Sequence, residues 1–313
     1  MPAFSLFTLL LLAAIWGGSF LFMRLAATSL GPVLLISLRV GLAALFLYWI
    51  AQLWRHSQSQ APLSPQVRGL QLKHNWRHYL LLGGFNSALP FLLFAYAAQT
   101  LGAALLSILN ATAPLWGALL NALWTRKRLP GSTLLGLALG AVGVTLLVGF
   151  DPALLRSGSE LAVMAALAAA FSYGIASNYS KHSTAGNQIS AFNNAHGSMW
   201  AATLLTAPWL LGAQLPPVQL DLTLISAVVG LGILCSGVAY LLYFRLIADL
   251  GPTSALTVTF LIPLFGVLWG YWLLDEALGW YSLAGGIAVL WGTALVTGCR
   301  LTTLFSSMRK VHA

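Results

Sequence analysis

Arg39 and His196 are ionisable side chains that lie within otherwise apolar segments of this sequence. An arginine in such a place can hold a carboxylate through paired hydrogen bonds, and a histidine can exchange a proton near neutral pH. Each lies seven residues beyond the start of its segment, about 10 Å deep at 1.5 Å per residue. The structural alternative is that both side chains reach back toward the membrane surface. Because no Asp or Glu lies near the centre of a segment, a coupling ion stays unassigned.

Uncharged polar side chains, prolines and aromatic rings within the apolar segments are the next candidates. A polar group in lipid is costly unless it faces other helices or a water-filled path, and a mid-segment proline frees backbone carbonyls. Interhelical hydrogen bonds, packing kinks and lipid-facing rings are the alternatives. The residues predicted to bind a small-molecule substrate are Trp16, Ser19, Phe20, Asn86, Tyr96, Asn110, Pro114, Tyr173, Asn178, Ser236, Tyr240, Thr259 and Pro263.

Ten apolar segments must position these residues. Each is about 20 residues long, the length that crosses a bilayer as a helix, and short polar breaks separate them. The predicted fold class is therefore an all-α integral membrane protein with ten transmembrane helices. The segments run over 4–23, 32–54, 79–99, 103–124, 133–150, 160–180, 189–211, 222–244, 253–274 and 280–299.

Composition agrees with lipid as the solvent of this chain. Apolar residues make up 59% of the 313 residues and charged residues only 7%, far below the roughly 25% of soluble domains. The net charge of +9 does not predict nucleic-acid binding, because no soluble segment carries a basic patch. Cys235 and Cys299 form neither a CxxC motif nor a disulfide framework, and we interpret both as free thiols. The first segment lacks the basic start of a signal peptide, so we expect it to be retained as a helix.

Basic residues fall mainly in alternate breaks, which predicts how the chain is oriented. Short loops rich in Lys and Arg remain in the cytoplasm. One side carries twelve such residues, and the other has only Arg24, Arg39 and Arg156. This bias predicts a bacterial inner (cytoplasmic) membrane protein with both termini in the cytoplasm. The twelve are Arg55, Arg68, Lys73, Arg77, Arg126, Lys127, Arg128, Lys181, Arg245, Arg300, Arg309 and Lys310.

The two halves of the chain match each other. An offset of 149 residues pairs Pro114 with Pro263 and Gly117 with Gly266, and an offset of 157 pairs Arg39 with His196 upstream. Five segments per half force the second half to enter the membrane in the opposite direction. We therefore predict two inverted five-helix repeats, residues 1–150 and 159–300, around a central cavity, followed by a cytoplasmic tail, residues 301–313. Such repeats commonly bind substrate near the midplane and work by alternating access.

Short motifs in both halves resemble the drug/metabolite transporter superfamily, EamA type. They are Ile15-Trp16-Gly17-Gly18-Ser19-Phe20, Ala113-Pro114-Leu115, Ile262-Pro263-Leu264 and Leu273-Leu274-Asp275-Glu276-Ala277-Leu278. The resemblance covers nearly the whole chain and implies a secondary transporter, with export of amino acids or related metabolites as a common activity. Family members often carry an acid where this chain has Arg126-Lys127-Arg128, which puts any role for paired acids in doubt.

The leading functional hypothesis is therefore a small-metabolite exporter that uses neither cofactor nor metal. Efflux of drugs or aromatic compounds and uptake of a nutrient are the alternatives among transporters. A membrane enzyme would require clustered His, Asp, Glu or Cys at one membrane face, and the sequence shows no such cluster. The expected partners are a small-molecule substrate and the lipid bilayer, whereas cargo identity, direction, coupling ion and oligomeric state stay open.

Overall fold

The computed structural model is all-helical over the residues that it describes, which are 3–57, 69–150, 159–183, 188–212, 218–251, 255 and 257–298. Helices are the expected solution, because each backbone N–H within lipid needs a partner in its own segment. The predicted tail, residues 301–313, lies outside these ranges, as do Arg68, Arg156 and Cys299. The longer helices, α1, α6, α7, α9, α13 and α14, span Ala3–Ser57, Gly131–Gly149, Ser159–His182, Ala191–Thr206, Val258–Leu274 and Trp280–Thr297.

The remaining elements are shorter pieces joined end to end. The helices α2 and α3 (Leu72–Gly83 and Leu89–Ala98) continue through a π-helix, η1 (Gly84–Ala88). A second π-helix, η3 (Gly230–Val238), likewise joins α10 (Leu222–Val229) to α11 (Ala239–Leu250). A turn at 111–112 separates α4 (Ala103–Asn110) from α5 (Ala113–Thr125), and the 3-10 helix η2 (Ala207–Leu211) extends α9.

Seven of these helical stretches are long and apolar enough to cross a bilayer. The chain is therefore a multi-pass membrane protein, as its composition predicts. The helix α13 is apolar but has only 17 residues. The seven stretches are Phe4–His56, Leu72–Ala98, Ala103–Thr125, Gly131–Gly149, Ser159–His182, Leu222–Leu250 and Trp280–Thr297.

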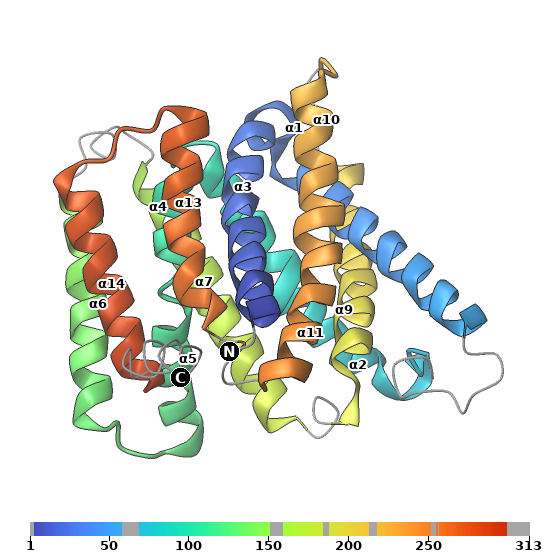
Figure 1. Ribbon diagram of the computed structural model, residues 1–313, viewed down its shortest axis with the longest axis horizontal. Helices are drawn as coiled ribbons and strands as arrows, with labels where there is room; N and C mark the ends of the chain where they lie inside the picture. Colours follow the sequence, from blue (N-terminus) through green and yellow to red (C-terminus); the bar gives the residue numbers. More distant parts are fainter. Residues whose placement is uncertain are drawn as a thin grey trace.

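The structure joins the first two predicted segments into the single element α1. Only Gly31 interrupts it, with φ 70° and ψ 160°, directly before Pro32. The positive φ requires glycine, and the proline that follows favours the extended ψ. No separate loop is needed, because one residue redirects the chain, and Figure 1 shows the second half of α1 leaving the bundle at an angle.

Glycines set the closest contacts between helices. The helices α6 and α14 lie side by side at one end of the molecule (Figure 1). A methyl group built on Gly292 would lie 2.5 Å from the carbonyl oxygen of Gly136, and one on Gly143 would lie 2.7 Å from that of Gly285. Such backbone contact between small residues is the usual way in which membrane helices pack tightly.

Two further helix pairs cross at glycines. A methyl group on Gly17 of α1 would lie 2.9 Å from the Gly266 nitrogen of α13, and one on Gly174 of α7 would lie 3.0 Å from the Gly117 nitrogen of α5. These crossings bring α1 and α7, which carry several of the candidate site residues, into the centre of the bundle.

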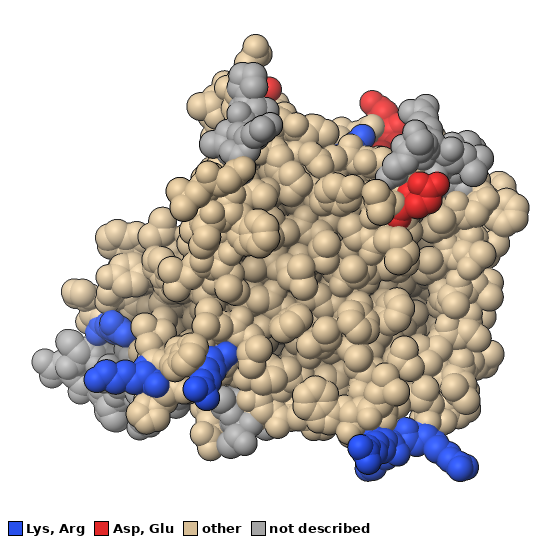
Figure 2. Space-filling model, turned by 180° about the vertical axis from the view of Figure 1, so that it is seen from behind, with Lys and Arg blue, Asp and Glu red and all other residues tan. Residues whose placement is uncertain are grey.

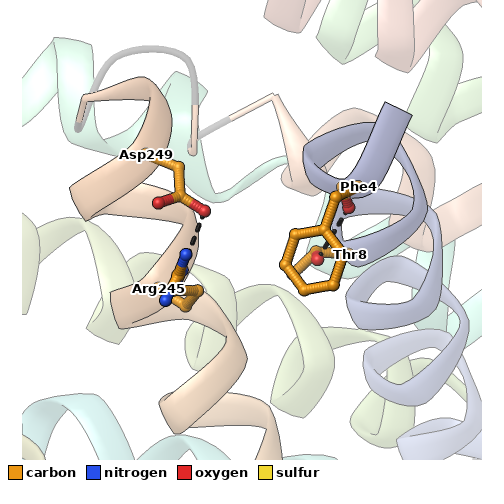
Figure 3. Close-up of polar contacts among 4 residues, drawn as sticks. All are labelled: Phe4, Thr8, Arg245 and Asp249. Carbon is orange, nitrogen blue, oxygen red and sulfur yellow. Dashed lines mark hydrogen bonds and ion pairs between the residues drawn. The ribbon is translucent and has the colours of Figure 1, made fainter. Parts of the chain in front are cut away.

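On the face seen in Figure 2, exposed charged side chains gather at two opposite edges of the molecule. Figure 2 shows Lys and Arg mostly along one edge and Asp and Glu near the other, with an uncharged belt between them. Among the described residues the one ion pair joins Arg245 and Asp249, whose Nε and Oδ2 atoms are 2.9 Å apart near the end of α11 (Figure 3). It faces the first turn of α1, where Thr8 donates a hydrogen bond to the Phe4 carbonyl. Arg39 therefore has no acidic partner in the described structure.

Candidate functional site

Arg39 lies at the centre of the candidate site and is only 4% exposed. Its Nε donates a hydrogen bond to the Ser236 hydroxyl of η3 at 2.9 Å, and one terminal nitrogen lies 3.6 Å from the sulfur of Met23. The guanidinium carbon lies 3.7 Å from the centre of the Phe91 ring. None of these three neighbours, Ser236, Met23 and Phe91, carries a negative charge that would compensate the guanidinium. A buried positive charge without an anionic partner favours the binding of an anionic ligand.

Aromatic rings form the wall around this arginine. Phe20 meets Phe94 edge to face, with 5.5 Å between ring centres, and Phe94 stacks on Tyr173 at 6.3 Å. Tyr173 and Tyr240 pack against the same buried core as Phe91 and Phe94. The arrangement combines apolar ring faces with two hydroxyl groups, so it can bind a small molecule that has both an apolar part and polar ends.

Trp16, in the first half of α1, contacts η3 and the Tyr240 ring of α11. Its indole N–H donates to the carbonyl oxygen of Cys235 at 3.2 Å, and its ring lies 6.3 Å from that of Tyr240. The Cys235 thiol in turn donates to the carbonyl oxygen of Ile15 at 3.2 Å. These reciprocal contacts fix α1 against η3 beside the arginine.

Both π-helices carry residues of the candidate site. Asn86 lies in η1 and donates a 3.5 Å hydrogen bond to the Tyr240 hydroxyl, and Ser236 lies in η3. A π-helix widens the helix by one residue per turn and is frequent at functional sites.

The structure thus brings together Trp16, Phe20, Arg39, Asn86, Tyr173, Ser236 and Tyr240, hereafter the arginine cluster. Sequence reasoning missed Met23, Phe91 and Phe94, which complete it. An apolar residue in a span carries no signal of its own, although Phe91 aligns with Tyr240 at the offset of 149 and could have been found in this way.

The other predicted site residues have varied surroundings. Ser19 is buried on α1 next to Phe20, whereas Tyr96 is 43% exposed on α3. The Asn178 amide donates to the carbonyl oxygens of Gly117 and Gly174, at 2.8 and 2.9 Å, where α5 crosses α7. This residue therefore has a structural role in the described conformation.

The two prolines predicted to bind substrate, Pro114 and Pro263, occupy different positions in their helices. Asn110 is the last residue of α4 and Pro114 is the second residue of α5, on either side of the turn at 111–112. Thr259 and Pro263 lie in α13, where Pro263 is buried inside a helix that continues past it. The prolines are thus not equivalent in local structure.

His196 lies apart from the arginine cluster. Its Nε2 accepts a hydrogen bond from the indole of Trp200 at 3.0 Å, and its side chain lines a cavity between α1, α2 and α9. Arg39 and His196 align in the sequence but have different surroundings in the structure.

Glu276 makes a contact that the sequence did not predict. Its carboxylate accepts hydrogen bonds from the backbone nitrogens of Ala103 and Ala104, at 2.6 and 3.0 Å, at the start of α4. Negative charge is favourable at a helix N-terminus. The loop after α13 is thereby bound to the first half of the chain.

Among the residues that the structure describes, no group of three His, Cys, Asp or Glu side chains could hold a metal ion.

These features define a multi-pass helical membrane protein with a polar, aromatic cluster in its interior. The profile of the EamA-like transporter family matches residues 3–149 and 160–298. The chain belongs to this family, which confirms the resemblance seen in its motifs. It is accordingly a transporter and not an enzyme.

Several relatives span nearly the same length. An uncharacterized transporter of Archaeoglobus fulgidus is 25% identical over 294 residues, which cover 90% of this chain and 93% of the relative. The uncharacterized transporter YvbV of Bacillus subtilis is 24% identical, with 91% and 88% covered. A probable amino-acid metabolite efflux pump of Escherichia coli is 24% identical, with 90% and 91% covered.

A solved crystal structure has the same fold. Its TM-score against this chain is 0.61, over 95% of this chain and 97% of the other. Because only 17% of the residues are identical, this likeness carries the fold and no conclusion about cargo.

Proposed function

We propose that this transporter exports a small carboxylate-bearing metabolite, with an amino acid or a derivative as the favoured cargo. The observation that carries the proposal is the uncompensated charge of Arg39 inside the arginine cluster. The guanidinium would bind the cargo carboxylate, while the amide oxygen of Asn86 and the hydroxyls of Tyr173 and Tyr240 would accept hydrogen bonds from an ammonium group. The probable function of the E. coli relative as an amino-acid metabolite efflux pump supports this cargo class and direction.

The proposed mechanism is alternating access by two inverted repeats, residues 1–150 and 159–300, each with five transmembrane helices. The family profile matches twice, once in each half. Gly136 contacts Gly292, and the residues paired with them at the offset of 149, Gly285 and Gly143, contact each other. A two-fold axis requires this reciprocity, which supports the repeat.

The other two glycine crossings have the same relationship. In the sequence repeat, Gly17 corresponds to Gly174 and Gly266 corresponds to Gly117. In the structure, Gly17 meets Gly266 at one crossing, and their counterparts Gly174 and Gly117 meet at the other. Arg126 and Asp275, also 149 residues apart, directly follow α5 and α13. Both adopt the left-handed conformation, with φ of 54° and 51°. The glycine crossings and the backbone at these two helix ends therefore support two related halves, although the paired prolines differ in local structure.

The proposed orientation places both termini in the cytoplasm of a bacterial cell. The basic edge in Figure 2 would face the cytoplasm and the acidic edge the outside. Because Arg39 is buried in this conformation, cargo reaches it only if helices separate. The π-helices and the turn between α4 and α5 are the interrupted elements at which we expect this movement.

Transport by purified protein tests the proposal. Liposomes that contain the protein should exchange labelled amino acids that carry a free carboxylate faster than protein-free liposomes do. The panel should include the matching amides, nucleosides and amphiphilic drugs. Movement of drugs but not of any carboxylate would replace this proposal with drug efflux, and movement of none would remove its main support.

Replacing Trp16 in the arginine cluster with alanine should reduce this exchange and leave the amount of protein in the membrane intact. We expect the same of Asn110, which lies beside the turn at 111–112 where we expect movement. For Trp16→Ala we expect about a tenfold loss, because ring contacts worth roughly 0.5–1.5 kcal/mol each disappear beside the cargo. Trp269→Ala is the matched control, since its indole also donates to a backbone carbonyl, that of Ala14 at 3.0 Å, outside the arginine cluster. Unchanged rates in Trp16→Ala and Asn110→Ala would remove both from the site.

A further inference from the structure

A cavity of about 820 Å³ lies between the second half of α1, α2 and α9. These helices lie at the end of the molecule away from α6 and α14 (Figure 1). Its volume is within the range of ligand pockets in proteins. Apolar side chains and ring faces form most of its wall, among them Tyr48, Ala51, Leu80 and Leu204. No residue of the arginine cluster lines it, so it is separate from the proposed cargo site.

The mouth of this cavity is held in place by hydrogen bonds to the loop 69–71. Tyr79 donates to the Leu70 carbonyl at 2.9 Å, and Asn193 of α9 donates to the Gly69 carbonyl at 3.3 Å. Gln71 adopts a left-handed conformation with φ 46° as the loop enters α2. These hydrogen bonds therefore give the mouth of the cavity a defined rim.

Positive charge collects at this rim. Arg55 and Lys73 are exposed and line the cavity, and none of its lining residues is acidic. A methyl group built on Gly69 would lie 3.0 Å from a terminal nitrogen of Arg55, so the guanidinium lies over the loop. An apolar interior under a basic rim is complementary to a molecule with a hydrocarbon chain and an anionic head.

The surroundings of the cavity identify the kind of molecule. Trp76 lines it and is exposed, and Trp49 and Trp54 are exposed on the neighbouring turns of α1. Tryptophans concentrate at the lipid headgroup level of membrane proteins, and basic pockets between helices on the cytoplasmic side bind anionic headgroups. We propose that this cavity binds an anionic phospholipid, with its phosphate at Arg55 and Lys73 and part of an acyl chain between α1, α2 and α9.

Native mass spectrometry of the full chain with phosphatidylglycerol or phosphatidylcholine tests this site. The wild-type protein should retain phosphatidylglycerol. The double variant Arg55→Ala/Lys73→Ala should retain it roughly tenfold less, because the headgroup phosphate loses both of its basic partners. Lys127→Ala/Arg128→Ala removes two exposed basic residues of another loop and should leave retention unchanged. Equal retention in all three proteins, or equal retention of both lipids by the wild type, would overturn the proposal.

Filling the cavity separates a lipid from a free phosphate ion. Ala51→Trp keeps both rim charges but occupies the apolar interior, and it should lower phosphatidylglycerol retention about as much as the double variant. Leu211→Trp, at a position 93% exposed, is the matched control. Unchanged retention in Ala51→Trp, or displacement of the lipid by millimolar inorganic phosphate, would mean that the rim binds phosphate alone and would contradict the proposal.

Discussion

Arg39→Ala should nearly abolish transport of carboxylate-bearing cargo while the protein still folds. Truncating one member of a buried, hydrogen-bonded charge pair typically costs about 2–5 kcal/mol, which corresponds to roughly 30-fold to several-thousand-fold weaker binding. Arg39→Lys should retain part of the activity, because it keeps the charge but loses the paired geometry of the guanidinium. Exchange rates and half-saturating cargo concentrations in liposomes measure both effects.

Two controls separate cargo binding from folding in this experiment. Arg24 lies in the same helix, but its side chain donates to the carbonyls of Ala98 and Gln99, each at 2.8 Å. Arg24→Ala should lower thermal stability and leave cargo affinity unchanged in the protein that remains folded. The second control is the cargo amide, which should be transported equally by wild type and Arg39→Ala. An equal loss for amide and carboxylate would show that Arg39 supports the structure and not the cargo.

Gly292→Ala should destabilise the protein severely, although alanine normally stabilises a helix by about 1 kcal/mol relative to glycine. The added methyl group would lie 2.5 Å from the carbonyl oxygen of Gly136 and 2.8 Å from the Gly140 nitrogen, which are backbone atoms of the facing helix. Overpacking of this kind costs about 1–3 kcal/mol or more. We expect a fall in melting temperature in detergent and less monodisperse protein.

Gly286→Ala provides the matched control in the same helix. Its methyl group would meet only the end of the Ile108 side chain, at 3.4 Å, so the melting temperature should stay the same or rise slightly. Gly143 pairs with Gly292 at the offset of 149, and Gly143→Ala should therefore be about as damaging as Gly292→Ala. A tolerated Gly292→Ala, or very different effects at these two positions, would contradict the packing described for α6 and α14.

Polar positions inside the spans were easier to recognise from the sequence than the shape of individual helices. Polar residues in lipid carry a strong signal, because each needs a partner, and Arg39 does bond to Ser236 and Asn86 to Tyr240. The face that a residue occupies carries little signal in a helix that is apolar all round. For this reason Tyr96 was grouped with the interior aromatics although it is 43% exposed.

Other features depend on contacts that no local pattern contains. The ring of Phe91 under Arg39 and the capping of α4 by Glu276 join residues far apart in the chain. The π-helices were not predicted either, because an extra residue in a turn leaves apolar composition unchanged; the nearby Gly83 and Gly84 are a weak local sign. The junction at Gly31 was predicted as a break between spans, but not as a single residue within one helical element.

The topology of two loops tests the central claim, that the halves insert in opposite directions. In a background without Cys235 and Cys299, single cysteines at Arg128→Cys and Ala277→Cys would be exposed to an impermeant maleimide in oriented membrane vesicles. We expect Ala277→Cys to react in right-side-out vesicles and Arg128→Cys only in inside-out vesicles. Reaction of both positions from the same side of the membrane would contradict the inverted repeat and the shared path between its halves.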